Sequence, residues 1–206
     1  MAAVSKVAPF RSAELQARLS TGFLAAYVAG NALFTVAKLS GVSSSNVLIA
    51  AAGLAFLAVV GGTIVTICLW TYRVVGNMAS LGVSGSPWTA ASAVAWCFVP
   101  FGFLVQPMWS VLDAWRGADT SAHRIDLGSR MDIKTPRVLI AWWLTWALTV
   151  VCILIGSRAR GAAASWIGTI AAVGFTAAAL LCLLVIRDVT EREQRKHQLI
   201  VSGQLV

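Results

Sequence analysis

Charged residues divide the chain into long uncharged segments. No Asp, Glu, Lys or Arg occurs within residues 19–37, 39–72, 74–112, 138–157 and 161–186. A helix needs about 20 apolar residues to cross the roughly 30 Å hydrocarbon core of a bilayer, and each segment reaches or approaches that length. The residues within them do not alternate with the period of two that strands of a transmembrane barrel require. We therefore predict membrane-spanning helices.

The first, second, fourth and fifth segments each predict one span. Helices are expected because lipid offers no partner to an unpaired backbone group. The predicted spans are residues 19–39, 47–72, 138–155 and 162–186, within a membrane domain of residues 19–186. A basic N-terminus, residues 1–18, precedes this domain, and a charged C-terminal helix and tail, residues 187–206, follows it.

The middle segment, residues 88–115, is the exception. One straight helix of this length would measure about 42 Å. It contains Pro100 and Pro107, and each proline removes a backbone hydrogen bond and disturbs the preceding turn. Three arrangements fit. The segment is one kinked span, or a span that ends near Gln106 and continues as an interfacial helix, or two half-helices that enter and leave on the same side.

The distribution of Lys and Arg distinguishes these arrangements, because cytoplasmic loops are enriched in both residues. If the middle segment crosses, the 16 basic residues divide 6 against 10 between the two sides. If it does not cross, they divide 13 against 3, with only Lys38, Arg158 and Arg160 on the minority side. We therefore predict an all-α integral membrane protein with four spans, a re-entrant middle segment broken by proline, and both termini in the cytoplasm. Five spans are the alternative.

Composition excludes the soluble classes of protein. Hydrophobic residues make up 58% of the 206 residues and charged residues 12%, against roughly 45–50% and about 25% in soluble domains. The net charge of +8 falls mainly on the predicted cytoplasmic face. The bilayer of the cell membrane, with its anionic lipids, is therefore the expected partner. No basic motif with interleaved aromatic residues indicates nucleic-acid binding.

The residues that usually carry chemistry are sparse. The cysteines all lie in uncharged segments and none forms a C-x-x-C pair; they are Cys68, Cys97, Cys152 and Cys182. No zinc-protease, nucleophile-elbow, Walker or Rossmann motif occurs. We predict no catalytic, metal-binding or cofactor-binding residue, and no enzymatic activity.

Ion-coupled transporters usually place ionisable groups at mid-membrane, and no Asp, Glu, Lys, Arg or His lies at the middle of these spans. Asn31 and Gln106 are the candidate polar residues within the membrane. For Asn31 we expect an interhelical hydrogen bond, with a place in a transport pathway as the alternative. In the C-terminal helix, three acids and bases are spaced as i,i+4 pairs in the favourable order: Asp188 with Arg192, Glu191 with Arg195, and Glu193 with His197.

An ordered series of aromatic and proline motifs resembles a known family. Its residues are Trp70, Tyr72, Arg73, Asn77 and Gly82 in a W-x-Y-R-x-x-x-N-x-x-x-L-G pattern, then Trp96, Pro100 and Pro107 in a W-x-F-[IV]-P-x-x-x-L-x-x-P pattern, then Trp142 and Trp143. The series is similar to that of the DUF4328 family of bacterial, largely actinobacterial, integral membrane proteins, over about residues 19–194. The family has no assigned function, so the resemblance implies a membrane fold and supplies no catalytic residue.

The sequence thus favours a small polytopic membrane protein that acts as a non-enzymatic interaction or membrane-organising component, in a homo- or hetero-oligomer. The alternative is a small transporter or channel. Its site would be the broken middle segment with Asn31, Asn77 and Gln106.

Overall fold

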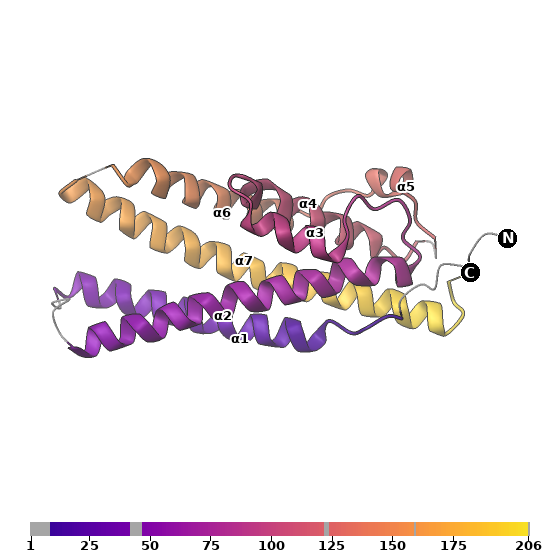
Figure 1. The fold of residues 1–206 in the computed structure, drawn as a ribbon, viewed down its shortest axis with the longest axis horizontal. Coiled ribbons are helices and arrows are strands. Elements are labelled where there is room, and N and C mark those ends of the chain that lie inside the picture. Colours follow the sequence, from indigo (N-terminus) through magenta and orange to yellow (C-terminus); the bar gives the residue numbers. More distant parts are fainter. Residues whose placement is uncertain (1–8, 42–46, 122–123, 159, 206) are drawn as a thin grey trace. The chain divides into compact units, whose positions relative to one another are not determined.

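The computed structural model describes residues 9–41, 47–121, 124–158 and 160–205, and these residues are mostly helical (Figure 1). In chain order the elements are α1 (Glu14–Leu39), α2 (Val47–Asn77), the 3-10 helix η1 (Met78–Leu81), α3 (Ala90–Ala95), the 3-10 helix η2 (Trp96–Phe98), α4 (Gly102–Gly117), α5 (Leu127–Asp132), α6 (Arg137–Gly156) and α7 (Ala162–Val201). Extended pairing within the described ranges is limited to an isolated bridge between Val83 and Ile125.

Four of these helices, α1, α2, α6 and α7, are long and apolar enough to cross a membrane. The prediction of an all-α membrane protein with four such helices is confirmed. Many of their large apolar side chains face outward, Leu54 and Leu57 of α2 and Trp166 of α7 among them. A helix that is apolar on all sides fits a lipid environment.

The chain forms two compact units, which we describe separately. The span unit comprises Arg18–Thr66 and Arg137–Val185. The end unit comprises Met1–Ala17, Ile67–Pro136 and Ile186–Val206. Helices α1, α2 and α7 each continue from one unit into the other, whereas α3, η2, α4 and α5 belong entirely to the end unit.

Small residues lie where the long helices of the span unit contact one another. The ring of Phe23 on α1 lies against Gly62 of α2, and Thr149 of α6 lies against Gly174 of α7, where a Cβ atom would collide with either side chain. Helix interfaces in membranes are enriched in such residues because lipid supplies no hydrophobic force between helices. The α1–α2 and α6–α7 pairs are therefore held by close packing.

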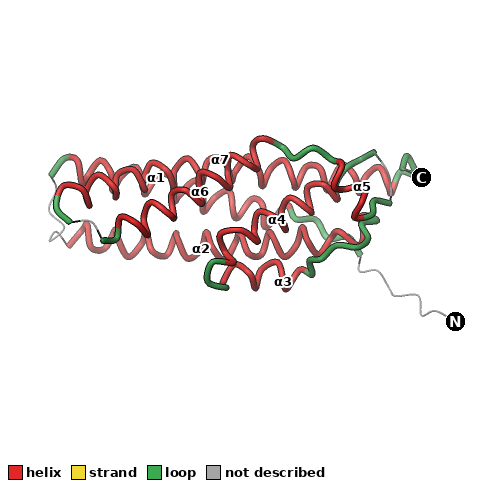
Figure 2. Tube along the Cα trace, turned by 90° about the horizontal axis from the view of Figure 1, so that it is seen from above, coloured by secondary structure: helices red, strands yellow, loops and turns green. Residues whose placement is uncertain are grey.

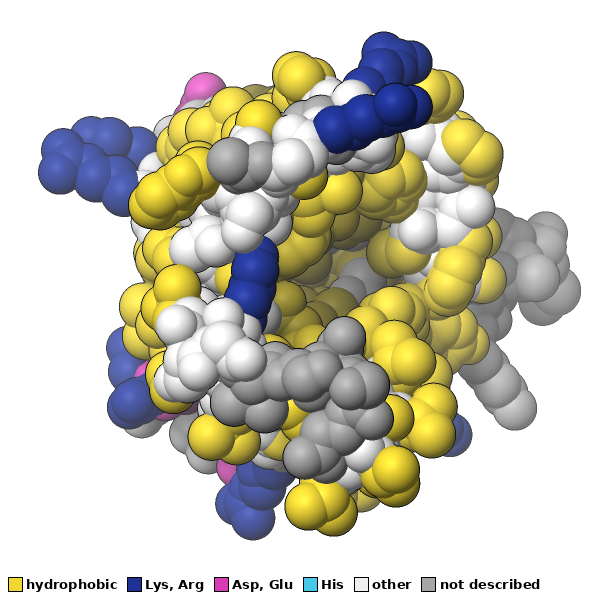
Figure 3. All heavy atoms as spheres, turned by 90° about the vertical axis from the view of Figure 1, so that its left-hand side faces the viewer, with side chains coloured by type: hydrophobic (Ala, Val, Ile, Leu, Met, Phe, Trp, Pro, Cys, Tyr) yellow, Lys and Arg dark blue, Asp and Glu magenta, His cyan; other side chains and the backbone are white. Residues whose placement is uncertain are grey.

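One end of the span unit carries few charges. Lys38, at the end of α1, donates a 3.2 Å hydrogen bond from Nζ to the carbonyl oxygen of Ser165 at the start of α7. Arg158 and Arg160 lie between α6 and α7. Figure 3 views this end, where Lys and Arg side chains stand apart among hydrophobic and uncharged ones. The three basic residues of the predicted minority side thus belong to one end.

The middle segment folds as a helical hairpin, which we define as residues 90–117. Helices α3 and η2 run one way, α4 returns beside them, and the turn lies at Val99–Phe101 (Figures 1 and 2). Phe101 has a φ of 62°, which is uncommon for a side chain of this size. The break is at Pro100, whereas Pro107 and Gln106 both lie inside α4. The segment is therefore two helical arms broken at Pro100 rather than one kinked helix, and its re-entrant course in the membrane stays a prediction.

Local sequence explains both ends of the hairpin. Thr89 caps α3: its hydroxyl oxygen accepts from the Ser92 backbone N–H at 3.1 Å, and Ser92 Oγ accepts from the Thr89 N–H at 2.9 Å. This reciprocal capping box satisfies two backbone donors that the helix leaves unpaired. Helix α4 continues through Pro107 in its second turn, where the missing N–H removes one i→i−4 hydrogen bond.

Candidate functional site

The hairpin packs along the part of α2 that belongs to the end unit. At its base, Ala90 lies 3.6 Å from the position that a Cβ atom on Gly76 would occupy. Further along, the Cys97 thiol lies within hydrogen-bonding reach of the Cys68 thiol. The hairpin therefore runs back along α2, past Arg73 and into its uncharged stretch, by about 12 Å.

The tip of the hairpin is apolar and exposed. Phe98 and Phe101 have 69% and 78% of their side chains accessible, and Val99 and Pro100 between them are also exposed. Trp96 lies beside the tip and is exposed as well. In water such a cluster would be unfavourable, so its position beside the apolar stretch of α2 points to lipid as its surroundings.

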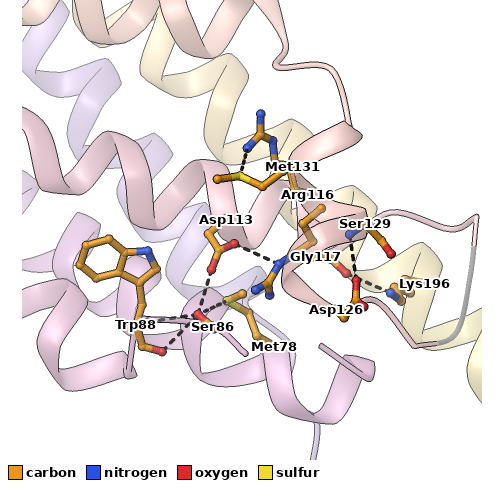
Figure 4. Close-up of polar contacts among 11 residues, drawn as sticks. Met78, Ser86, Trp88, Asp113, Arg116, Gly117, Asp126, Ser129, Met131 and Lys196 are labelled. Carbon is orange, nitrogen blue, oxygen red and sulfur yellow. Dashed lines mark hydrogen bonds and ion pairs between the residues drawn. The ribbon is translucent and has the colours of Figure 1, made fainter. Parts of the chain in front are cut away.

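The polar end of α4 is fixed by two hydrogen bonds and an ion pair (Figure 4). Asp113 Oδ2 accepts a 2.8 Å hydrogen bond from Ser86 Oγ, and its Oδ1 lies 3.3 Å from Nε of Arg130. The Arg130 side chain is only 1% exposed. One turn further, the Gly117 carbonyl oxygen accepts a 3.0 Å hydrogen bond from Nζ of Lys196, on α7. The hairpin thus has a polar base and an apolar tip.

A second set of contacts joins α4 to α7. Trp115 Nε1 donates a 2.6 Å hydrogen bond to Asp188 Oδ2. The Arg192 guanidinium lies 4.0 Å from the centre of the Trp115 ring and pairs with Asp119 at 2.9 Å. Stacking on an aromatic face and pairing with a carboxylate are both suited to the planar guanidinium. These contacts fix the base of the hairpin to the polar part of α7.

Asn77, the last residue of α2, connects three segments. Its Nδ2 donates to the Arg11 carbonyl oxygen at 2.9 Å and to Glu193 Oε2 at 3.1 Å, and its Oδ1 accepts from the Arg11 backbone N–H at 3.2 Å. One turn earlier on α7, Thr190 Oγ1 accepts a 3.0 Å hydrogen bond from the buried Trp70 indole. We call Asn77, Arg11, Glu193, Trp70 and Thr190 the end junction.

Glu193 is a buried carboxyl group. The apolar part of α7 ends at Ile186, so Glu193 lies about two turns beyond the predicted span. Within the described part of the chain its Oε1 atom has no hydrogen-bond partner. Burial raises the pKa of Glu193 well above its ordinary value, and the bond from Asn77 opposes this shift only in part. Burial therefore disfavours the ionised form of this carboxyl group.

The two termini of the described chain meet in the end unit. The Phe10 ring stacks on the His197 ring with 4.0 Å between centroids. Ser12 Oγ accepts a 3.3 Å hydrogen bond from Nε2 of Gln194. Together with the Asn77–Arg11 bonds, these contacts place the start of α1 and the end of α7 on the same side.

The structure brings together only some of the residues selected from sequence. Those in the end unit are Trp70, Tyr72, Arg73, Asn77, Gly82, Trp96, Pro100, Gln106 and Pro107, and those in the span unit are Asn31, Trp142 and Trp143. Gly82 ends η1 with a φ of 76°, a conformation that suits glycine. Tyr72 is exposed and Arg73 is half-buried. Asn31 Nδ2 donates to the Ala172 carbonyl oxygen at 2.7 Å and to Thr176 Oγ1 at 2.8 Å, which joins α1 to α7.

Several charged residues of the end unit were missed by sequence reasoning; they are Asp113, Arg130, Glu193 and Lys196. The C-terminal helix was expected to carry i,i+4 pairs between acids and bases. Only Arg187–Glu191, at 2.6 Å, has this spacing among the ion pairs of the described residues. Asp188 and Arg192 contact Trp115 of α4 instead. The buried residues 186, 189, 190, 193 and 196 follow helical spacing along α7, but only the first two are apolar, so the sequence gave no signal for Glu193 and Lys196.

Comparison with known proteins identifies the family. The sequence model of the DUF4328 family, described as a domain of unknown function, matches residues 35–191. This match covers more than half of the chain, and the chain therefore belongs to the DUF4328 family. No curated protein and no solved structure matches it.

Proposed function

We propose that this DUF4328 protein is a non-enzymatic membrane-organising component, which its four spans anchor and whose hairpin occupies one leaflet of the cell membrane. The observation that supports this proposal is the course of the hairpin. From Ala90 beside Gly76 it reaches Cys97 beside Cys68, and there it exposes aromatic side chains.

Physical chemistry favours lipid around the tip. Transfer of one exposed Phe side chain from water to an apolar medium contributes about 1.5–3 kcal/mol, and the tip carries Phe98 and Phe101. A helix pair that enters and leaves on one side adds volume to one leaflet and none to the other. This asymmetry would bend the bilayer or recruit the protein to curved regions.

The basic residues support a cytoplasmic end unit. The termini meet there, and the end unit contains 11 of the 16 Lys and Arg residues, with Arg18 and Arg137 directly next to its boundaries. Several of them are exposed, namely Arg11, Arg124, Lys134, Arg187 and Arg195. Positive loops face the cytoplasm, where the leaflet is rich in anionic lipid. The hairpin would therefore insert into the cytoplasmic leaflet.

The transporter alternative has less support. Asn31 is engaged with α7, and Asn77 is engaged with Arg11 and Glu193. Phe98 and Phe101 make the tip of the hairpin apolar, so the break offers no polar side chain to a solute. These polar groups hold helices together, which favours a packing role.

The depth of the hairpin can be measured with spin labels on the full chain in liposomes. A cysteine-free background would carry one label at Phe101→Cys, at Leu69→Cys on the exposed face of α2, or at Leu127→Cys on α5. We expect the Phe101→Cys label to collide with oxygen more than with a water-soluble nickel chelate, as the Leu69→Cys label does. If the Phe101→Cys label were as accessible to the nickel chelate as the Leu127→Cys label, the proposal that the hairpin inserts into the membrane would be wrong.

The organising activity can be measured as a change in vesicle shape. We expect liposomes containing the wild-type protein to be smaller and more curved by electron cryomicroscopy than those with Phe98→Ser plus Phe101→Ser. The matched control is Leu127→Ser plus Met131→Ser, which removes two exposed apolar side chains from α5. The activity would be rejected if wild type and the hairpin variant gave vesicles of equal diameter. It would also be rejected if the control variant increased the vesicle diameter as much as the hairpin variant does.

A further inference from the structure

A shallow groove lies on the outside of α1 and α2 within the span unit. It has a volume of about 310 Å³. Its lining residues are Arg18, Leu19, Gly22, Phe23 and Ala26 of α1 and Val59 of α2. All of them except Arg18 are apolar, and five of the six come from one face of one helix.

Small residues form the floor of the groove. Gly22 and Ala26 are four residues apart and therefore lie on the same face of α1, one above the other. Nothing lies within 4 Å of the position that a Cβ atom on Gly22 would occupy. Phe23 turns toward Gly62 of α2 and forms a wall. The groove is therefore open to the outside and is lined along α1 from Arg18 to Ala26.

The charge in the groove lies at one end. Arg18 is the last charged residue before the uncharged stretch that begins at residue 19. Its side chain is exposed, and it makes no hydrogen bond or ion pair within the part of the chain that the structure describes. Gly22 and Ala26 lie about 6 Å and 12 Å further along the helix axis. Along α1 the groove thus has a cation at the membrane interface, followed by an apolar stretch that leads into the membrane.

A phospholipid has the same order of groups. We propose that the groove is a binding site for one anionic phospholipid, with its phosphate at the Arg18 guanidinium and one acyl chain on the floor formed by Gly22 and Ala26. Guanidinium binds phosphate oxygens through two parallel hydrogen bonds, which fixes the headgroup as well as attracting it. Phe23 and Val59 contact the two sides of the acyl chain. This site belongs to the span unit and does not depend on insertion of the hairpin.

Matched substitutions test the two parts of the site. Arg18→Gln removes the charge, and Arg158→Gln removes an exposed arginine from the opposite end of the span unit. Gly22→Leu fills the floor, and Gly61→Leu adds the same side chain to α2 at a glycine that also has open space around it. Ala26→Leu is a second way to fill the floor if Gly22→Leu lowers the yield of folded protein.

Native mass spectrometry of the full chain, with phosphatidylglycerol or phosphatidylcholine added to the detergent, measures retention of lipid. We expect one phosphatidylglycerol to be retained by wild type, Arg158→Gln and Gly61→Leu. We expect roughly tenfold weaker retention in Arg18→Gln and in Gly22→Leu or Ala26→Leu, since a charge-assisted bond to phosphate exceeds the roughly 1.4 kcal/mol of a tenfold change. Equal retention of the two lipids by wild type, or equal losses in the control variants, would overturn the site.

Discussion

The Asn77 side chain of α2 donates a 3.1 Å hydrogen bond to the Glu193 carboxyl group of α7, 116 residues away in sequence. The same amide group donates to the Arg11 carbonyl oxygen, and its oxygen accepts from the Arg11 N–H. One side chain therefore satisfies both backbone groups of a non-helical residue and a buried acid together. This arrangement explains how the N-terminal segment, α2 and α7 are held in one unit.

Substitution of Asn77 should destabilise the end unit. Asn77→Ala leaves the Arg11 backbone groups and Glu193 Oε2 without their partner, and an unsatisfied buried polar group costs about 1–3 kcal/mol. Thermal unfolding of the purified protein in detergent should show a lower Tm. Gln198→Ala, an exposed polar position on α7, is the control. If the two variants had the same Tm, the hydrogen bonds of Asn77 would not contribute to stability.

Glu193 should make stability depend on pH. Its pKa is raised by burial, so the folded state holds the proton at a pH where the unfolded state has lost it. Stability is therefore fully present below the ordinary pKa of Glu and falls as pH rises toward the raised value. Glu193→Gln keeps an acceptor for Asn77 and removes this ionisation, so the variant should melt at a higher temperature than wild type at neutral and alkaline pH.

The neighbouring Lys196 makes stability depend on pH with the opposite sign. Burial lowers the pKa of Lys196 to about 8, so its contribution favours the folded state increasingly as pH rises above that value. Only the difference between the wild-type and Glu193→Gln curves therefore reports on Glu193. The control is Glu191→Gln, which changes an exposed acid on the same helix and should follow the wild-type curve. A pH-independent difference for Glu193→Gln would contradict the prediction.

The ion pair between Asp113 and Arg130 should be costly to break on one side. Asp113→Asn retains an acceptor for Ser86 but leaves the buried guanidinium without a counter-charge, and Arg130→Met leaves the carboxylate alone. Removal of one partner of a buried pair typically costs about 3–5 kcal/mol, because it leaves a charge unpaired. We expect the double variant to be more stable than the sum of the two single losses predicts, in denaturant unfolding.

The exposed pair Arg187–Glu191 supplies the control cycle. It has a short distance of 2.6 Å, but both side chains are mostly in solvent. Exposed pairs are screened by water and salt, and no measurable coupling is expected from this cycle. Similar coupling in both cycles would show that burial of Arg130 has no energetic consequence.

Much of the helical architecture followed from the positions of the charges. Uncharged stretches of about 20 residues or more are expected to be helical in lipid, because a helix pairs its own backbone polar groups. Helices α1, α2, α6 and α7 match this expectation. The proline residues indicated a broken middle segment but not the position of the break. Pro107 lies inside α4, whereas Pro100 lies in the turn, where Phe101 after it adopts a left-handed conformation.

The end unit was harder to predict, because its contacts join residues that are distant in sequence. Trp115 to Asp188 and Arg192 to Asp119 each span 73 residues, and no local pattern specifies such a pairing. The acids and bases of α7 alternate in a way that suits an exposed helix equally well. Asn77 was selected from its family motif, but its partner Glu193 lies beyond residue 191, where the family match ends.

Loss of the Asn31 bonds should weaken the packing of α1 on α7 in the span unit. Asn31→Val removes both hydrogen bonds to α7, and interhelical hydrogen bonds in membranes contribute about 0.6 kcal/mol on average and up to about 1.7. Unfolding by SDS in mixed micelles should therefore show a small loss of stability. Thr169→Val is the control, because its hydroxyl donates to Ser165 within α7. If Asn31→Val were as stable as Thr169→Val while transport of a solute were lost, Asn31 would be a pathway residue and the packing role would be wrong.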